Sequence, residues 1–335
     1  MRKWIDSTLQ ERRVMLHQSS VGEKLPDYAI EKDWWVSMVL KALFQTECKD
    51  FLEFKGGTSL SKGWQLIDRF SEDIDLSLSH RFFGSAAENN TQLKNLRKKS
   101  RKYILESLSM QLDTQMKALG LSGYEVVPVS ENEAGEPISS DADPTVIYVN
   151  YASVAEGRSE YVQPRVKVEI SCLSMDEPFE MKTLTSIISK YFPAEDEDSE
   201  STLPVVLPSR TFLEKAFLLN EEFQKEQPRS LRMTRHLYDL ERIMDTDFGR
   251  DALSDKELYK NIVEHRRKFY HVGYADYDKD YPKRIEFLPP ERCMADWSAD
   301  YALMVSRFVY GDHLPFDKLL SRIAQLQERF RSLDL

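Results

Sequence analysis

The sequence predicts an α+β protein in which a mixed sheet with flanking helices precedes a helical domain. Short runs with strand-like alternation of apolar residues occupy residues 51–54, 73–78, 124–129, 145–151 and 165–171. Helical spacing dominates from residue 208 onward. We therefore expect a sheet-containing core with N-terminal helices over residues 1–205, and a helical domain over residues 206–335 that completes a cleft.

Helices are also expected within the first half. Residues 30–44 and 91–119 carry apolar side chains at helical spacing, and Gly120 is a C-terminal stop for the second segment. A short helix is expected after residue 57, with apolar residues at Leu60, Trp64 and Ile67. The polar run 130–144 and the acidic run 194–201 are expected to be loops, the acidic one with solvated side chains.

The second half carries amphipathic patterns. Thr211 and Glu214 fit a capping box at the start of a helix. The expected buried stripes are Phe212, Ala216, Leu219 and Phe223; Met233, Leu237, Leu240 and Met244; and Leu319, Ile323, Leu326, Phe330 and Leu333. Residues after 250 carry no motif that indicates chemistry.

The composition is that of a globular protein with a large core. The chain has 335 residues, 30% of them charged and 41% hydrophobic, and no run approaches the roughly 20 apolar residues that cross a bilayer. Cys48, Cys172 and Cys293 lack zinc-site spacing and are expected to be free thiols in a reducing compartment. We therefore expect a cytoplasmic monomer without membrane contact.

The net charge of −10 excludes attraction of nucleic acid by the whole surface. Contact with RNA therefore requires a local basic patch. The candidate patches are residues 94–102, with basic residues at six of nine positions; Arg229, Arg232 and Arg235; and Arg266-Arg267-Lys268. Each patch has an alternative interpretation as an ordinary solvated helix face.

The segment 51–79 combines glycines with closely spaced carboxylates. Asp73 and Asp75 lie two residues apart in an apolar run, so their side chains share one face of a strand. Neighbouring carboxylates repel each other unless a cation lies between them, and their oxygens suit Mg²⁺ or Mn²⁺. Gly56-Gly57 permits backbone amides to approach an anion at the start of the next helix. A phosphate cradle beside a carboxylate metal site is what nucleotidyl transfer requires.

The segment GGTSLSKGW followed by RFSEDIDL resembles the nucleotidyltransferases of the AbiEii/AbiGii toxin family, in the DNA-polymerase-β-like superfamily. The superfamily signature is an apolar residue before Gly-Gly or Gly-Ser, a spacer, and Asp-x-Asp or Asp-x-Glu on a strand. Residues 69–72, RFSE, are typical of the AbiEii group. The resemblance spans residues 30 to 245 and implies a polymerase-β-like nucleotidyltransferase core. Residues 30–36, IEKDWWV, resemble the family's N-terminal helix and are interpreted as core.

Glu169, in the run RVKVEIS, is the candidate third carboxylate. Arg165, Lys167 and Glu169 share one face of the expected strand, where an acid needs a metal or a partner. An ion pair near Lys167 is one interpretation. The strand resembles the family's third-carboxylate strand, which favours a metal ligand or a base for the attacking hydroxyl. Glu72 alternates away from Asp73 and is left out of the site.

Four further residues near the acids are candidate phosphate ligands. Thr58 and Ser59 offer hydroxyls and amides, and Thr58 also fits a helix cap. Lys62 lies one turn further along. Arg69 precedes the acidic strand, where it would hold the aspartates, a phosphate, or a structural ion-pair partner.

The segments PSRTFLEKAFLL and RSLRMTRHLYDLERI resemble a second family motif, EK followed by R-H-x-x-D-L. Lys215, Arg235, His236 and Asp239 stand at the matching positions. The resemblance implies that Lys215 and Asp239 are needed for activity. Lys215 lies off the centre of its apolar stripe, so its ammonium is expected to bind the triphosphate. Asp239 has Arg235, His236 and Arg242 at helical spacing, which also fits a plain ion-pair cluster; His236 is more typical of packing than of catalysis.

By resemblance, the protein is a metal-dependent nucleotidyltransferase that acts as the toxin of a toxin–antitoxin or phage-defence pair. The resemblance implies an NTP donor, an RNA acceptor, with the 3′ end of tRNA favoured, and a cognate antitoxin. Two alternatives stay open: transfer of NMP to a protein or small molecule, and nucleotide binding without turnover. The nucleotide added, the number added and the mode of the antitoxin do not follow from the sequence.

Overall fold

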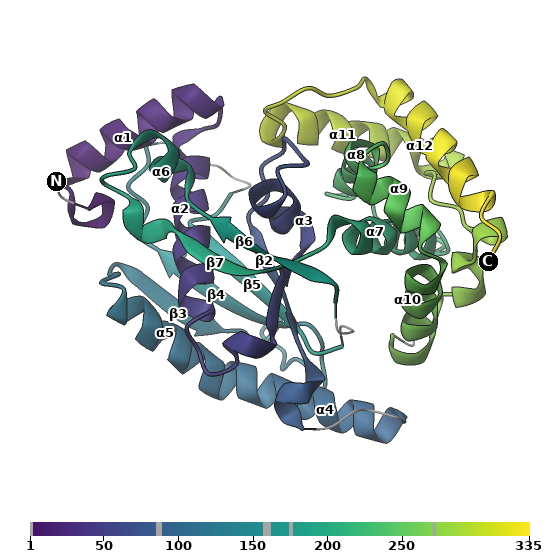
Figure 1. Ribbon diagram of the computed structural model, residues 1–335, viewed down its shortest axis with the longest axis horizontal. Coiled ribbons are helices and arrows are strands. Elements are labelled where there is room, and N and C mark those ends of the chain that lie inside the picture. Colours follow the sequence, from purple (N-terminus) through teal and green to yellow (C-terminus); the bar gives the residue numbers. More distant parts are fainter. Residues whose placement is uncertain (1–2, 85–88, 157–161, 174–176, 271–272) are drawn as a thin grey trace. The chain divides into compact units, whose positions relative to one another are not determined.

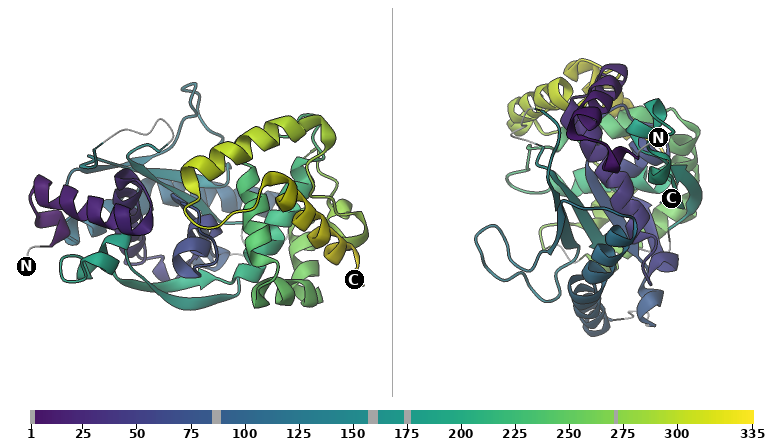
Figure 2. Two further views of the ribbon diagram at one scale, coloured as in Figure 1. Left: turned by 90° about the horizontal axis from the view of Figure 1, so that it is seen from above. Right: turned by 90° about the vertical axis from the view of Figure 1, so that its left-hand side faces the viewer.

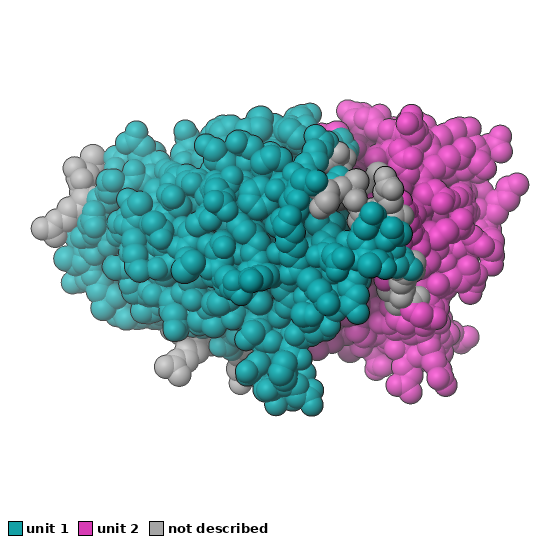
Figure 3. Space-filling view, turned by 90° about the horizontal axis from the view of Figure 1, so that it is seen from below, with its two compact units in different colours: residues 1–63, 71–205 teal, residues 64–70, 206–335 magenta. Residues whose placement is uncertain are grey.

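The computed structural model describes residues 3–84, 89–156, 162–173, 177–270 and 273–335. The chain divides into two compact units, coloured teal and magenta in Figure 3. Unit 1 comprises Met1–Gly63 and Ser71–Val205, and unit 2 comprises Trp64–Phe70 and Val206–Leu335. The sequence predicts a single division at residue 205. The structure agrees there but places residues 64–70 in unit 2 and not in the first domain.

Unit 1 is built on a mixed sheet, for which the described residues supply seven strands (Figure 1). The strand order is β3-β4-β5-β2-β1-β7-β6. Strand β2 runs parallel to β5 and β1 runs parallel to β7, whereas the β1–β2, β3–β4 and β4–β5 pairs are antiparallel. The strands are β1 (Leu52–Lys55), β2 (Asp73–Leu78), β3 (Tyr124–Pro128), β4 (Thr145–Tyr151), β5 (Arg165–Ser171), β6 (Phe179–Leu184) and β7 (Ser201–Val206).

The sequence predicted the first five strands but not β6 and β7. Strand β6 exposes most of its side chains, so it lacks the buried alternate face that marks a strand in sequence. Strand β7 contains Pro204 and directly follows the acidic run. The predicted α+β class with a mixed sheet is confirmed.

The helices of unit 1 are α1 (Leu9–Glu23), α2 (Asp27–Leu43), α3 (Gly56–Thr58), α4 (Asn90–Tyr103), α5 (Ser109–Ala118) and α6 (Ile187–Tyr191). A π-helical stretch, Ile104–Leu108, joins α4 to α5, so the long helix expected over residues 91–119 is confirmed. Gly120, which follows it, adopts a left-handed φ of 78°. The helix expected over residues 30–44 is α2.

The core of unit 1 lies between α2 and the sheet, against which α2 packs along β2 and β5 (Figure 1). Trp34 and Trp35 of α2 are fully buried, and the ring of Trp35 stacks on Tyr151 of β4 with centroids 4.9 Å apart. Nε1 of Trp34 donates to Oδ1 of Asp196 at 2.7 Å. Asp196 is buried, so the expectation of solvated side chains in the acidic run is wrong at this residue. The other acidic residues of the run are exposed or partly exposed, namely Glu195, Glu197, Asp198 and Glu200.

The helix after the glycines is shorter than predicted. It consists of α3 and a π-helical turn, Ser59–Gly63, and ends at Gly63. Trp64 and Ile67 lie outside it, in unit 2, where Nε1 of Trp64 donates to the carbonyl of Val206. The helical spacing of Leu60, Trp64 and Ile67 therefore does not reflect one helix, because the chain enters unit 2 after Gly63.

Unit 2 is helical, with α7 (Pro208–Glu222), α8 (Thr234–Ile243), α9 (Asp247–Ser254), α10 (Lys256–Phe269), α11 (Met294–Phe308) and α12 (Phe316–Arg331), the last two yellow in Figure 2. The predicted stripes on α7, α8 and α12 are buried, except that Phe223, Met233, Met244 and Leu333 lie beyond the helix ends and Phe223 and Leu333 are partly exposed. The predicted capping box is wrong because α7 begins earlier, with Pro208 in its first turn, and Glu214 pairs with Arg210.

The three cysteines are buried free thiols, as predicted. Burial raises the pKa of the Cys48 and Cys172 thiols, which makes them poor nucleophiles. In the part of the chain that the structure describes, no helix has the length and apolar character to span a membrane.

Candidate active site

The two aspartates of the DxD pair lie on one face of β2. Asp73 and Asp75 are half-buried, whereas Ile74 and Leu76 between and after them are fully buried on the opposite, α2-covered face. The parallel register places Glu169 of β5 opposite Asp75. The backbone therefore brings the three predicted carboxylates to neighbouring positions on two adjacent strands.

Gly56 makes the approach to Asp75 possible. It follows β1 directly and adopts a φ of 83°, in the left-handed region. A Cβ atom at this position would lie 2.0 Å from Oδ2 of Asp75. No other residue fits at residue 56 without displacing the carboxylate, which gives the first glycine of the motif a physical role in the site.

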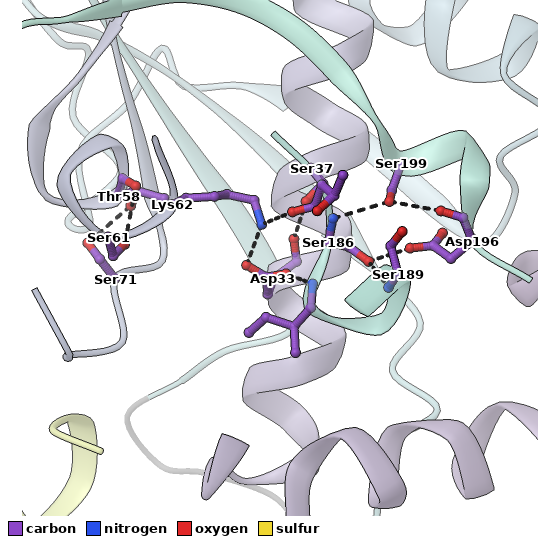
Figure 4. Close-up of polar contacts among 12 residues, drawn as sticks. Asp33, Ser37, Thr58, Ser61, Lys62, Ser71, Ser186, Ser189, Asp196 and Ser199 are labelled. Carbon is purple, nitrogen blue, oxygen red and sulfur yellow. Dashed lines mark hydrogen bonds and ion pairs between the residues drawn. The ribbon is translucent and has the colours of Figure 1, made fainter. Parts of the chain in front are cut away.

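The hydroxyls of Thr58 and Ser59 tie the turn together. Oγ1 of Thr58 donates to the carbonyl of Asp73 at 2.5 Å and contacts Oγ of Ser71 at 3.0 Å, as Figure 4 shows for Ser71. Oγ of Ser59 donates to the carbonyl of Gly56. The interpretation of Thr58 as a cap is wrong, because Lys55 occupies the N-cap position. Thr58 instead fixes the turn to the first residue of β2.

Glu169 forms an ion pair with Lys167 on the same strand, with Nζ and Oε1 2.9 Å apart. Burial lowers the pKa of Lys167, but the hydrogen bond and charge of Glu169, aided by Asp73, outweigh it and raise the pKa overall. Lys167 is therefore a cation held among the acids. The ion pair that the sequence left open is present.

A divalent cation fits Asp73 and Asp75 better than it fits the full triad. Both aspartates offer hard oxygen donors on one face, and Gly56 approaches the carboxylate of Asp75 closely. Among the described residues, no group of three His, Cys, Asp or Glu side chains is arranged to hold a metal. Oε1 of Glu169 is engaged by Lys167, which reduces the negative charge that Glu169 offers to a cation.

Lys62 and Asp33 connect the glycine turn to α2. Nζ of Lys62 lies 2.7 Å from Oδ1 of Asp33 (Figure 4). It also donates to the carbonyl of Thr185, at 2.7 Å. The Lys62 side chain is only 8% exposed. Its ammonium would have to leave both partners to reach a phosphate, so the observed contacts are those of a structural ion pair.

A second ion pair from α2 holds the start of β2. Nζ of Lys32 lies 2.6 Å from Oε2 of Glu72, and both side chains are at most 7% exposed. Lys32 also donates to the carbonyl of Gln163. Glu72 therefore points into the interior, as its exclusion from the site predicted, and this orientation directs Asp73 to the opposite face.

Sequence reasoning did not predict the role of Lys32 and Asp33. It interpreted residues 30–36 as core, because apolar side chains dominate that segment. Glu31 is also engaged, accepting from Oγ of Ser153 and from the amide of Val154. A signal was present: three consecutive charged residues on a buried helix need partners elsewhere in the chain.

The second motif forms a buried ionic cluster within unit 2. Asp239 of α8 is fully buried and accepts from Nε and Nη2 of Arg69, at 2.7 and 2.6 Å. Nζ of Lys215, on α7, lies 2.8 Å from Oδ2 of the same carboxylate. Although burial opposes its charge, these two cations lower the pKa of Asp239. Burial is also the main cause that lowers the pKa of Lys215.

This cluster differs from the one predicted on α8 alone. The partners of Asp239 come from other segments, whereas Arg242 pairs with Asp68. Lys215 is 7% exposed, so its ammonium rests on Asp239 rather than projecting outward. His236 is buried, and burial followed by nearby cations lowers its pKa well below the usual range, so it is neutral. Arg235 is half-buried.

The model of the nucleotidyl transferase AbiEii toxin family, from type IV toxin–antitoxin systems, matches residues 39–322. The chain belongs to this family. It is therefore a nucleotidyltransferase that uses an NTP, and as a toxin of this type it implies a cognate antitoxin. No curated protein matches the chain. The AbiEii match spans both the DxD pair and the Lys215–Asp239 motif.

We predict that Lys32→Met lowers the free energy of unfolding by about 3–5 kcal/mol, because it leaves Glu72 as an uncompensated buried charge. Replacing both residues, as Lys32→Met with Glu72→Leu, is expected to cost less than Lys32→Met alone. Urea unfolding measures both. Lys117→Met, in an exposed pair with Asp113, is the control and should cost less than about 1 kcal/mol. Equal losses for Lys32→Met and Lys117→Met would contradict the buried-pair role.

We predict that Asp239→Asn destabilises the protein by about 3–5 kcal/mol at neutral pH, because Arg69 and Lys215 lose their common counter-charge. The folded pKa of Asp239 lies below the unfolded value of about 3.9. The stabilisation is therefore complete above that value and is lost as the pH falls through the folded pKa. Urea unfolding at several pH values should show the wild-type advantage shrinking below about pH 4.

Asp247→Asn is the control for that experiment, since its side chain is 87% exposed. It should change stability by less than about 0.5 kcal/mol at any pH. A wild-type advantage over Asp239→Asn that does not change with pH would show that the carboxylate charge is not what stabilises the cluster.

Proposed function

We propose that this toxin transfers nucleotides from an NTP to an RNA acceptor at the Asp73–Asp75 pair, with the 3′ end of tRNA as the favoured acceptor. The single observation that carries the proposal is the close approach of Gly56 to Asp75, which joins the glycine turn and the acid pair into one site. The resemblance of the motifs to those of the AbiEii family supports tRNA, whose blocked 3′ end would halt translation. A role in phage defence stays a prediction.

In the proposed reaction, one phosphorus–oxygen bond forms and another breaks. The 3′-hydroxyl oxygen of the acceptor attacks the α-phosphorus of the NTP, and the bond from that phosphorus to the bridging oxygen of the β-phosphate breaks, releasing pyrophosphate. When bound at Asp73 and Asp75, Mg²⁺ or Mn²⁺ neutralises the charge of the phosphates. Glu169 accepts the proton of the attacking hydroxyl once the Glu169 carboxylate has separated from Lys167. The glycine turn, from Gly57 to Ser59, holds the phosphates through its backbone amides, because the hydroxyls of Thr58 and Ser59 already donate to carbonyls.

Lys215 is proposed to bind the triphosphate, with Asp239 as its resting partner. Asp239 holds two cations, so the departure of Lys215 leaves its carboxylate paired with Arg69 through two hydrogen bonds. The carboxylate is therefore never left buried without a counter-charge. Arg235 and His236, on the same helix as Asp239, are further candidate phosphate ligands by the resemblance of the motif.

Charge on α4 favours RNA over a protein or small-molecule acceptor. Lys94, Lys98 and Lys102 recur at four-residue spacing and are exposed, so they share one face of α4. Two of them have only long acidic contacts, since Nζ of Lys94 lies 3.9 Å from Asp141 and Nζ of Lys102 lies 3.9 Å from Glu106. The other two basic stretches are used within the fold, since Arg229 pairs with Glu222 and Arg266 pairs with Glu221.

The two alternatives to an RNA acceptor differ in how far the family assignment bears on them. Transfer of NMP to a protein or small molecule uses the same donor chemistry and differs only in the acceptor. Binding of nucleotide without turnover loses its support, because the family is one of enzymes. A cytoplasmic location and a monomeric state stay predictions.

We predict that the protein incorporates label from at least one α-labelled NTP into total tRNA in the presence of Mg²⁺. Asp75→Ala should lower incorporation about a hundredfold or more, because a ligand of the cation is removed. Gel separation of the labelled products measures this. Label on a protein band and none on RNA would show that the acceptor is a protein and not RNA. Undiminished activity of Asp75→Ala would contradict the assignment of Asp75 as a metal ligand.

We predict that Lys215→Ala raises the KM for NTP by about tenfold or more, since a charge-assisted contact to phosphate is lost. The KM for tRNA should change by less than about twofold. Lys260→Ala, an exposed lysine on α10, is the matched control and should leave both constants unchanged. An unchanged KM for NTP in folded Lys215→Ala protein would show that Lys215 has a purely structural role.

A further inference from the structure

A tyrosine and an arginine form a cation–π pair on the sheet face that carries the acids. Cζ of Arg165, on β5, lies 4.1 Å from the ring centroid of Tyr148, on β4. Arg165 is exposed and Tyr148 is half-buried, so the pair is accessible from solvent. An aromatic ring covered by a guanidinium is the kind of surface on which unpaired bases stack.

The pair lies in register with the acids. Tyr148 is the Cα partner of Lys167, and Lys167 is the Cα partner of Asp73. The neighbours of Tyr148 on β4, Ile147 and Val149, are fully buried on the other face. Because adjacent strands are separated by about 4.8 Å, the backbone of Tyr148 lies about 10 Å from that of Asp73 across the sheet.

The strand order places this pair and the glycine turn on opposite sides of the acids. The order β4-β5-β2-β1 puts Tyr148 and Arg165 on one side of β2, and Gly56, which follows β1, on the other. In nucleotidyl transfer, the attacking and leaving oxygens lie roughly in line through the α-phosphorus. A triphosphate held at the glycine turn therefore requires the acceptor hydroxyl to arrive from the side of β5 and β4.

We propose that Tyr148 and Arg165 form the acceptor subsite, on which the terminal base of a single-stranded RNA end stacks. This inference rests on the proposed RNA acceptor and specifies how its end is held. Lys167, beside the pair, contacts the last phosphate. That contact gives Lys167 a new anionic partner, so Glu169 becomes available to the attacking hydroxyl.

Steady-state kinetics with total tRNA and the incorporated NTP tests the subsite. Tyr148→Ala is expected to raise the KM for tRNA about tenfold, the typical cost of losing a stacked base, and to leave the KM for NTP within about twofold. Tyr148→Phe keeps the ring and should behave like the wild type. Phe179→Ala removes an exposed aromatic ring from β6 and is the matched control, expected to change neither constant.

A rise in the KM for NTP with no change in the KM for tRNA would overturn the proposal, because it would assign the ring to the incoming nucleotide. Fluorescence anisotropy with a single-stranded RNA oligonucleotide tests binding without turnover, with thermal unfolding as a check of folding. Weaker binding by Tyr148→Ala supports the subsite, and equal binding, or none by the wild type, overturns it. Failure of the proposed function is distinct: the wild type would then label no RNA, whatever its affinity for the oligonucleotide.

Discussion

The buried ion pair between Lys32 and Glu72 is the constraint on which the acid site of unit 1 depends. Glu72 is tied to α2, on the interior side of the sheet, so strand alternation sends Asp73 and Asp75 to the other side. The next residue of α2, Asp33, holds Lys62 at the end of the glycine turn. One helix thus orders both the turn and the start of the strand, although none of its side chains belongs to the proposed chemistry.

In unit 2, one buried carboxylate holds two cations. The buried carboxylate of Asp239 pairs with both Lys215 and Arg69, and both cations contact its Oδ2. Arg69 belongs to the short segment 64–70, which packs in unit 2 while the residues before and after it belong to unit 1. The chain therefore returns from this ionic cluster to Asp73 within four residues. Arg69 therefore links the motif that contains Asp239 to the segment that leads into Asp73, although the two are distant in sequence.

Local periodicity explains what was predictable. The shared face of Asp73 and Asp75, the neighbouring strand with Glu169, and the long helix ended by Gly120 follow from alternation and helical spacing, which depend only on nearby residues. Partners distant in sequence were not predictable in this way. Lys62 pairs with Asp33, Arg266 pairs with Glu221, and Asp196 accepts a hydrogen bond from Nε1 of Trp34. From the sequence, Lys62, Arg266 and Asp196 were interpreted as surface charges or ligands. The role of Lys32 was missed for the same reason.

Binding of Mn²⁺ in the presence of a non-hydrolysable NTP tests the central claim most directly, because it requires neither an acceptor nor turnover. Electron paramagnetic resonance measures the free Mn²⁺. The wild type should bind the ion more tightly with the nucleotide than without it, and Asp73→Asn and Asp75→Asn should each weaken binding by about tenfold or more. Asp113→Asn, on α5, should match the wild type. Wild-type affinity in both Asp73→Asn and Asp75→Asn would contradict the assignment of the metal to this acid pair.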